Sequence, residues 1–189
     1  MKVLVFDNYD SFTFNLVHLV EKITGEKPDV FRNDELEIAA AEKYDKIILS
    51  PGPGIPAEAG LLLPLIKTYA PTKSMFGVCL GQQAIAEAFG AQLYNLENVF
   101  HGVATTIVTE KDPGFLFRNI PQRFQAGRYH SWVVNEKTLP AELVVTARDE
   151  EGRIMALQHR LFNVAGVQFH PESIMTEFGE ELMKNFLQQ

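Results

Sequence analysis

The only cysteine of the chain, Cys79, lies at a predicted junction between a strand and a helix. The residues before it, Ser74–Val78, are mostly apolar, as in a buried strand, and Leu80–Phe89 is rich in helix-forming residues. Gly77 and Gly81 flank the cysteine at two residues on each side, which permits the tight turn of a nucleophile elbow. A thiol at a helix N-terminus faces unpaired N–H groups and the positive end of the helix dipole, which favour the reactive thiolate. The pattern predicts a nucleophilic cysteine, and a buried structural cysteine is the alternative.

A cysteine nucleophile needs a base, and the chain has five histidines. His170 directly follows a predicted apolar strand, Val164–Phe169, so it should emerge at the edge of the sheet where the cysteine lies. Glu172 comes two residues later and could orient the imidazole, as the third member of a triad does. Two other histidines are weaker candidates for the base, because His18 falls within a predicted helix and His159 lies near a turn where we expect it to be solvated.

Acyl transfer also needs backbone donors that hold an oxyanion. The elbow supplies the N–H group of Leu80 as one donor. The segment Ser50–Gly54 reads Ser-Pro-Gly-Pro-Gly, and a glycine backbone can approach a substrate closely. Gly54 is therefore the second candidate donor, and the alternative is that this loop is only a rigid turn.

Strand-like and helix-like segments alternate in the first half of the chain, which predicts a mostly parallel sheet with helices on both faces. Sites in such sheets lie at the carboxyl ends of the strands, so the loops 7–10 and 51–56 should share one edge with the elbow. The predicted strands are Lys2–Phe6, Asp29–Phe31, Lys46–Ser50 and Ser74–Val78. The predicted helices are Ser11–Thr24, one opened by a capping box at Asp34–Glu37, Gly60–Tyr69 and Leu80–Phe89.

The second half is rich in β-branched residues and turn signals, which predicts a mixed or antiparallel extension packed on the same core. The predicted strands are Gly102–Thr109, Ser131–Val134, Leu143–Arg148, Ile154–His159 and Val164–Phe169, and Glu177–Leu187 is a predicted helix. The 189 residues are enough for one domain, over 1–189.

Composition limits the function classes. Hydrophobic residues make up 46% and charged residues 22%, as in soluble globular proteins. The net charge of −7 and the lack of a basic run argue against a nucleic-acid surface. A lone cysteine, no signal-peptide layout and no long apolar stretch predict a cytoplasmic protein without a membrane partner. No metal-ligand spacing stands out, so no cofactor or metal is expected in this chain.

Three motifs together resemble the class I, or triad, glutamine amidotransferases, and the resemblance covers essentially the whole chain. They are Cys-Leu-Gly-Gln-Gln at 79–83, Val-Gln-Phe-His-Pro-Glu-Ser at 167–173 and Ser-Pro-Gly-Pro-Gly at 50–54. The resemblance implies a three-layer α/β/α, flavodoxin-like fold and a Cys79–His170–Glu172 triad. Within the family, segments 7–15 and 128–131 resemble the glutaminase subunits of anthranilate synthase and aminodeoxychorismate synthase.

The resemblance also implies a glutamine pocket, with one wall from the glycine-rich loop and contacts from the elbow helix and from backbone groups further along. The implied residues are Gly52, Pro53, Gly54, Gln83, Ser131 and Trp132. The sequence departs from the common pattern in two places, because Trp132 stands where Leu is usual and Gln82 where His is frequent. Backbone contacts should survive the first change, and the second lies beside the site.

Ammonia released by such a site needs an acceptor, so the resemblance implies a partner, a large subunit that aminates chorismate with Mg²⁺ in its own site. We favour anthranilate synthase and tryptophan synthesis, with aminodeoxychorismate synthase and folate synthesis, or a subunit shared by both, as alternatives. A stand-alone cysteine amidohydrolase and a non-catalytic binding module are more distant ones. The loop Asp7–Phe12 is a candidate partner contact, or else a helix start that Asp10 or Ser11 caps.

Overall fold

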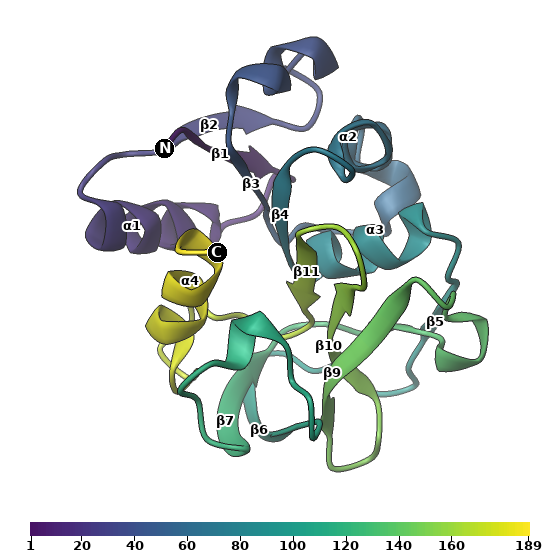
Figure 1. Cartoon of the computed structure of the whole chain (residues 1–189). Helices are drawn as coiled ribbons and strands as arrows, with labels where there is room; N and C mark the ends of the chain where they lie inside the picture. Colours follow the sequence, from purple (N-terminus) through teal and green to yellow (C-terminus); the bar gives the residue numbers. More distant parts are fainter.

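A nine-stranded sheet runs through the computed structural model, which describes residues 1–189 (Figure 1). Its strand order is β2-β1-β3-β4-β11-β10-β9-β6-β7. The first part is parallel and consists of β2 (Asp29–Arg32), β1 (Val3–Asp7), β3 (Lys46–Leu49), β4 (Ser74–Val78) and β11 (Val164–Val167). The antiparallel extension consists of β10 (Ile154–His159), β9 (Leu143–Asp149), β6 (Val103–Thr109) and β7 (Arg123–Arg128). This confirms the predicted α/β sheet with an antiparallel extension.

Helices cover both faces of the sheet. Figure 1 shows α1 (Thr13–Thr24) and α4 (Gly179–Leu187) on one face, and α2 (Leu62–Tyr69) and α3 (Leu80–Ala88) on the other. Each face has its own cluster of buried apolar side chains. On the α4 side, for example, the ring of Phe76 stacks on that of Phe186 with centroids 5.3 Å apart. The predicted three-layer architecture is therefore confirmed. Separately, no helix is both long and apolar enough to cross a bilayer.

The carboxyl ends of the parallel strands meet at one edge, as predicted. In the register of β4 and β11, Val78 lies opposite Val167, so Cys79 and Gln168 leave the sheet side by side. At β1 and β3, the backbone N–H of Asn8 donates to the hydroxyl of Ser50 at 2.8 Å. The loops that follow β1, β3, β4 and β11 are thereby held together around the elbow.

The predicted helix opened by Asp34–Glu37 is wrong. Instead of an α-helix, this segment forms a 3₁₀ helix at Ile38–Lys43. Glu37, the residue before it, makes no side-chain cap. The carboxylate of Asp34 instead accepts the hydroxyl of Tyr9 at 2.8 and 2.9 Å. Because this carboxylate serves a tertiary contact, the capping box does not form. The other 3₁₀ helices are Pro56–Glu58, Phe115–Phe117 and Glu136–Thr138.

The start of α1 also differs from expectation. Phe12 occupies the cap position, without a side-chain cap. The carboxylate of Asp10 accepts the N–H of Phe12 at 2.7 Å, so it supports the turn before the helix. The predicted capping by Asp10 or Ser11 is therefore wrong.

The second half differs from expectation at three strands: one predicted strand pairs outside the main sheet, and two strands were not predicted. The predicted strand at 131–134 is β8 (Trp132–Val134), which pairs only with β5 (Leu93–Asn95) in a separate two-stranded sheet. Strand β7 was not predicted. Its sequence, Arg-Phe-Gln-Ala-Gly-Arg, carries charges at both ends and an internal glycine, and it forms the edge of the sheet, where such residues are tolerated.

Candidate active site

The elbow places Cys79 in a strained backbone conformation. Its φ of 53° and ψ of −103° lie in a region that residues other than glycine rarely adopt. A Cβ atom on Gly77 would lie 2.4 Å from the carbonyl carbon of Gly81, and one on Gly81 would lie 2.4 Å from the carbonyl oxygen of Leu49. The predicted steric need for both glycines is confirmed. The elbow holds the thiol between the end of β4 and the start of α3, with 5% of the residue exposed.

His170 and Glu172 form a buried pair near the thiol. Nδ1 of His170 lies 2.7 Å from a carboxylate oxygen of Glu172, and the exposed fractions of the two side chains are 2% and 0%. The other ring nitrogen, Nε2, is buried and makes no hydrogen bond of ordinary geometry. The rings of Phe12 and Tyr129 pack against the imidazole in T-shaped arrangements, at centroid distances of 5.6 and 4.8 Å. Nδ1 is thus held by a carboxylate, while Nε2 is buried away from solvent.

The charge of His170 depends on its neighbours. Burial acts to lower its pKa, but the interactions with the neighbouring Cys79 and Glu172 outweigh burial and raise the pKa to about 10. The imidazole is therefore protonated at neutral pH. An imidazolium beside a sulfur atom stabilises a thiolate there.

A pocket of about 270 Å³ opens in front of Cys79. The residues that the sequence predicts for the glutamine pocket and for the oxyanion donors all line it: Gly52, Pro53, Gly54, Leu80, Gln83, Ser131 and Trp132. His170 and Glu172 are not among its lining residues. Sequence reasoning missed further lining residues, which are Val99, Phe100, His101, Tyr129 and His130.

Two backbone N–H groups at this pocket are free to bind an oxyanion. Leu80 is the first residue of α3, so its N–H has no partner within the helix. Gly54 lies in the loop after β3 with φ of 71°, a conformation that suits glycine, and its N–H donates to no backbone carbonyl. Both predicted donors therefore lie at the same pocket as the thiol.

Three buried polar side chains at the site had no role in the sequence reasoning. The amide of Gln168 donates to the sulfur of Cys79 at 3.5 Å, and it accepts from Gln83. His130 contacts the carbonyl of Trp132. Arg128 supports His130 from the interior. Their positions within the motifs at 128–131 and 167–173 were the only signal, and a motif does not show which atoms meet.

His159, expected in solvent, is buried. Its ring stacks on that of Phe162 at a centroid distance of 4.2 Å, and its Nδ1 accepts two backbone N–H groups, from Leu161 and Phe162. These contacts satisfy the imidazole within a turn after β10. His18 lies in α1, as expected, and its side chain is exposed.

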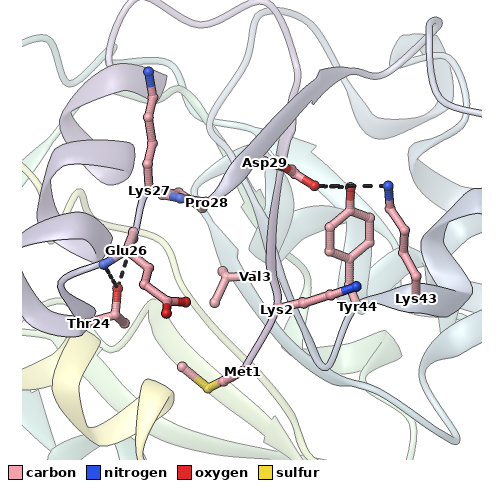
Figure 2. Close-up of a pocket in the computed structure, with 10 residues that line it drawn as sticks. All are labelled: Met1, Lys2, Val3, Thr24, Glu26, Lys27, Pro28, Asp29, Lys43 and Tyr44. Atoms are coloured by element: carbon pink, nitrogen blue, oxygen red, sulfur yellow. Dashed lines mark hydrogen bonds and ion pairs between the residues drawn. The ribbon is translucent and has the colours of Figure 1, made fainter.

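Another pocket, of about 230 Å³, lies at the opposite edge of the sheet, around the amino ends of β1 and β2 (Figure 2). On one of its sides, Tyr44 donates to Asp29 at 2.7 Å, and Lys43 pairs with the same carboxylate. Its charged groups are thus partly neutralised by each other. No cysteine or histidine lines it.

Comparison with known proteins gives a consistent result. The sequence model of the family described as "Glutamine amidotransferase class-I" matches residues 4–189. A Bacillus subtilis protein named "Aminodeoxychorismate/anthranilate synthase component 2" is 45% identical, over 98% of this chain and 95% of its own length. "Anthranilate synthase component 2" of Thermus thermophilus is 46% identical, over 100% of this chain and 92% of its own. A solved glutamine amidotransferase structure from Thermotoga maritima has a TM-score of 0.80 at 16% identity, covering 100% of this chain and 96% of that one, and this likeness shows the fold.

Proposed function

Because the chain belongs to the class I glutamine amidotransferases, we propose that it hydrolyses L-glutamine to glutamate and ammonia through a thioester on Cys79. The observation that carries this proposal is the strained cysteine elbow beside a buried His170–Glu172 pair, at a pocket with two free backbone N–H donors. Such a constellation activates a nucleophile and stabilises a tetrahedral intermediate.

The proposed reaction begins with the ion pair of Cys79 and His170. The thiolate attacks the side-chain amide of glutamine, and the N–H groups of Leu80 and Gly54 hold the oxyanion. Protonated His170 then gives its proton to the leaving nitrogen, and the carbon–nitrogen bond breaks to release ammonia. The neutral imidazole next takes a proton from water, whose oxygen attacks the thioester. Glutamate leaves, and the sulfur and imidazole return to their starting state.

Substrate binding is assigned to the pocket in front of the thiol. The loop of Gly52, Pro53 and Gly54 forms one wall, with Gln83, Ser131 and Trp132 contributing the rest. In this proposal Gln83 and the backbone of 131–132 bind the amino-acid portion of glutamine. The carbonyl of Trp132 accepts hydrogen bonds from Gln83 and His130, so these two side chains hold the backbone at this side of the pocket.

Glutaminase assays on the purified chain test the chemistry. Wild type should release glutamate from L-glutamine, and Cys79→Ala should lower the rate by at least about a thousandfold, since the nucleophile is lost. A Cys79→Ser protein with the normal rate would contradict the mechanism. Complete inactivity of the folded wild type, with or without a partner, would contradict the proposed function.

We further propose that the ammonia passes to a large subunit that aminates chorismate to anthranilate. The relatives from Bacillus and Thermus support this, because their names denote second components of such synthases. The Mg²⁺ of this reaction is assigned to the partner, and a cytoplasmic location belongs to the same proposal. The name of the Bacillus relative also favours aminodeoxychorismate formation, or a subunit shared by both enzymes, as the second candidate.

The choice is tested by mixing the chain with each candidate large subunit, chorismate, Mg²⁺ and glutamine, and identifying the aromatic product. Anthranilate formed with glutamine as the nitrogen source supports the tryptophan assignment. Aminodeoxychorismate would move the chain to folate synthesis, and both products would indicate a shared subunit. If no large subunit used glutamine through this chain, the partner assignment would be wrong, and a stand-alone amidohydrolase would remain.

A further inference from the structure

A continuous series of buried and partly buried hydrogen bonds leads from Arg128 in β7 to the sulfur of Cys79. It begins at an ion pair in which Nη1 of Arg128 lies 2.9 Å from a carboxylate oxygen of Asp149, with exposed side-chain fractions of 1% and 4%. The guanidinium carbon also lies 3.6 Å from the centroid of the Phe100 ring. The cation at this end is thus confined by a charge and an aromatic face.

Arg128 determines which nitrogen of His130 carries the hydrogen. Its Nε donates to Nε2 of His130 at 3.0 Å. Because a guanidinium can only donate, Nε2 must accept, and the hydrogen of the neutral ring lies on Nδ1. Nδ1 is 3.1 Å from the carbonyl oxygen of Trp132, so it donates there. Burial and the charge of Arg128 lower the pKa of His130 to about 3, which keeps the ring neutral at physiological pH.

The same carbonyl orients two amides in turn. Nε2 of Gln83 donates to the oxygen of Trp132 at 2.9 Å and to Oε1 of Gln168 at 3.1 Å. Because Oε1 of Gln168 accepts this bond, its Nε2 is left to face the sulfur of Cys79, at 3.5 Å. From the carbonyl onward, each link therefore fixes the donor of the next link, up to the thiol, while His130 and Arg128 hold the carbonyl in place. The reverse orientation of either amide would oppose carbonyl oxygens or place one against the sulfur.

We propose that Gln168 donates a hydrogen bond that stabilises the Cys79 thiolate, and that Gln83 is a positioning residue that holds the Gln168 amide in this orientation. Arg128 and His130 position the Trp132 carbonyl to which Gln83 donates. The inference rests on the proposed role of Cys79 as nucleophile. Gln168 is fully buried and does not line the pocket, so it acts on the sulfur and not on bound glutamine. A hydrogen bond to a charged acceptor is stronger than one between neutral groups, and a thiolate is a charged acceptor.

The test is the rate at which iodoacetamide alkylates Cys79 in the full chain at pH 7, without glutamine. Gln168→Met removes the donor and keeps the volume, and we expect the rate to fall roughly tenfold to a hundredfold, the scale of one hydrogen bond to a charged group. Gln168→Glu keeps the shape but presents an oxygen to the sulfur, so its rate should fall further. Gln83→Met should give an intermediate loss, because Gln168 loses the partner that orients it.

Gln82→Met is the matched control. Its amide is also fully buried, in the same helix as Gln83, but neither of its polar atoms has a partner. Its alkylation rate should stay within about twofold of wild type, as for a group outside the series. In the glutaminase assay, Gln168→Met should lower kcat by a factor similar to the loss in alkylation and leave KM for glutamine within about twofold.

A folded Gln168→Met protein that is alkylated at the wild-type rate would overturn the inference. So would an equal loss in the Gln82→Met control, since any buried amide would then have the same effect. If Gln168→Met does not fold, Gln168→Glu, which retains the acceptor for Gln83, carries the test. Alkylation rates as expected in a wild type that never hydrolyses glutamine would support this inference and contradict the proposed function.

Discussion

At the scale of single residues, the proposed chemistry depends on the charge of His170. Glu172 is one of the groups that raise its pKa to about 10, and it is fully buried, so solvent does not screen the interaction. The carboxylate also fixes which ring nitrogen carries a hydrogen, because Nδ1 must donate to it. Nε2 is then the nitrogen that exchanges a proton with the reacting groups.

Glu172→Gln should lower both activity and basicity. An amide of similar size keeps the packing but removes the negative charge and can present an N–H group to Nδ1, which favours the wrong tautomer. We expect kcat to fall on the order of 10²- to 10⁴-fold, and the pKa of His170 to decrease. Glutaminase assays and an NMR titration of the imidazole measure the two effects. Glu180→Gln, at an exposed ion pair on α4, is the control and should change neither. An unchanged titration of His170 in Glu172→Gln would contradict this account.

Sequence reasoning could single out Cys79, His170 and Glu172 as candidates, because each stands at the end of a recognisable strand or within a specific motif. It did not allow Gln168, His130 or Arg128 to be assigned roles. Their interactions join atoms of β7, α3 and the end of β11, and such contacts depend on the packing of distant strands. The same limit explains why His159 was expected in solvent. The neighbouring Arg160 and the turn signal gave no sign of the aromatic rings that pack against it.

At the scale of elements, the elbow is the structure on which the site depends. Alternating strands and helices predicted it, because the local signals of strand, glycine and helix former agree there. The error at 34–37 arose where local and tertiary signals conflict, since Tyr9 uses the carboxylate that would cap a helix. Strand β7 was missed because edge strands tolerate residues that are rare in central ones.

Gly81→Ala should disable the elbow. The added methyl would lie 2.4 Å from the carbonyl oxygen of Leu49, so β3 and α3 would have to separate. We expect a loss of at least about 2 kcal/mol in the free energy of unfolding and a much lower glutaminase rate, measured by denaturant unfolding and by glutamate release. Ala88→Gly, in the last turn of the same helix, should reduce stability by about 1 kcal/mol and retain activity. Equal activity in Gly81→Ala and wild type would contradict the elbow geometry.

The loop after β1 is the element where partner contact is expected. Tyr9 has φ of 61° and is 50% exposed, while its hydroxyl and ring are held by Asp34 and Arg32. It is therefore an ordered aromatic residue on the surface. Tyr9→Ala should weaken product formation with the large subunit and leave basal glutaminase activity within about twofold, because Tyr9 lies outside the pocket. Tyr9→Phe, which keeps the ring, is the control. Normal synthesis of the aromatic product by Tyr9→Ala would rule out this contact.

At the scale of the whole molecule, stability should depend on pH through His130. Its pKa of about 3 in the folded chain is lower than the ordinary value of 6.5, because burial and Arg128 disfavour the charged ring. Between these values the unfolded chain binds the extra proton, so stability decreases as the pH falls. The contribution is fully present above pH 6.5 and is lost progressively toward pH 3.

Denaturant unfolding of wild type and His130→Asn at pH 7 and pH 5 measures this effect. For one such histidine, the free energy of unfolding should drop by about 2 kcal/mol between the two pH values. The variant lacks the titrating ring, so its drop should be smaller by that amount, whatever its absolute stability. His159 is present in both proteins and cancels in the comparison. Identical drops in the two proteins would show that His130 is not held neutral.

The fold brings residues from both halves of the chain to the same pocket. The parallel strands bring Cys79, the glycine-rich loop and His170 to one edge, and the segment 129–132 from the second half lines the pocket together with Cys79 and this loop. The fold class could be predicted because alternation and β-branched runs are properties of the sequence itself. The separate β5–β8 pair could not, because strand pairing is decided by long-range packing.

The central claim, that Cys79 is the nucleophile of a glutamine-binding site, is tested most directly by covalent labelling. The chain is treated with a glutamine analogue that carries a diazoketone in place of the amide, and the modified residue is mapped by mass spectrometry. The account predicts one label per chain, on Cys79, with the labelling rate reduced by excess L-glutamine. Labelling elsewhere, or labelling of Cys79 that L-glutamine does not slow, would contradict it.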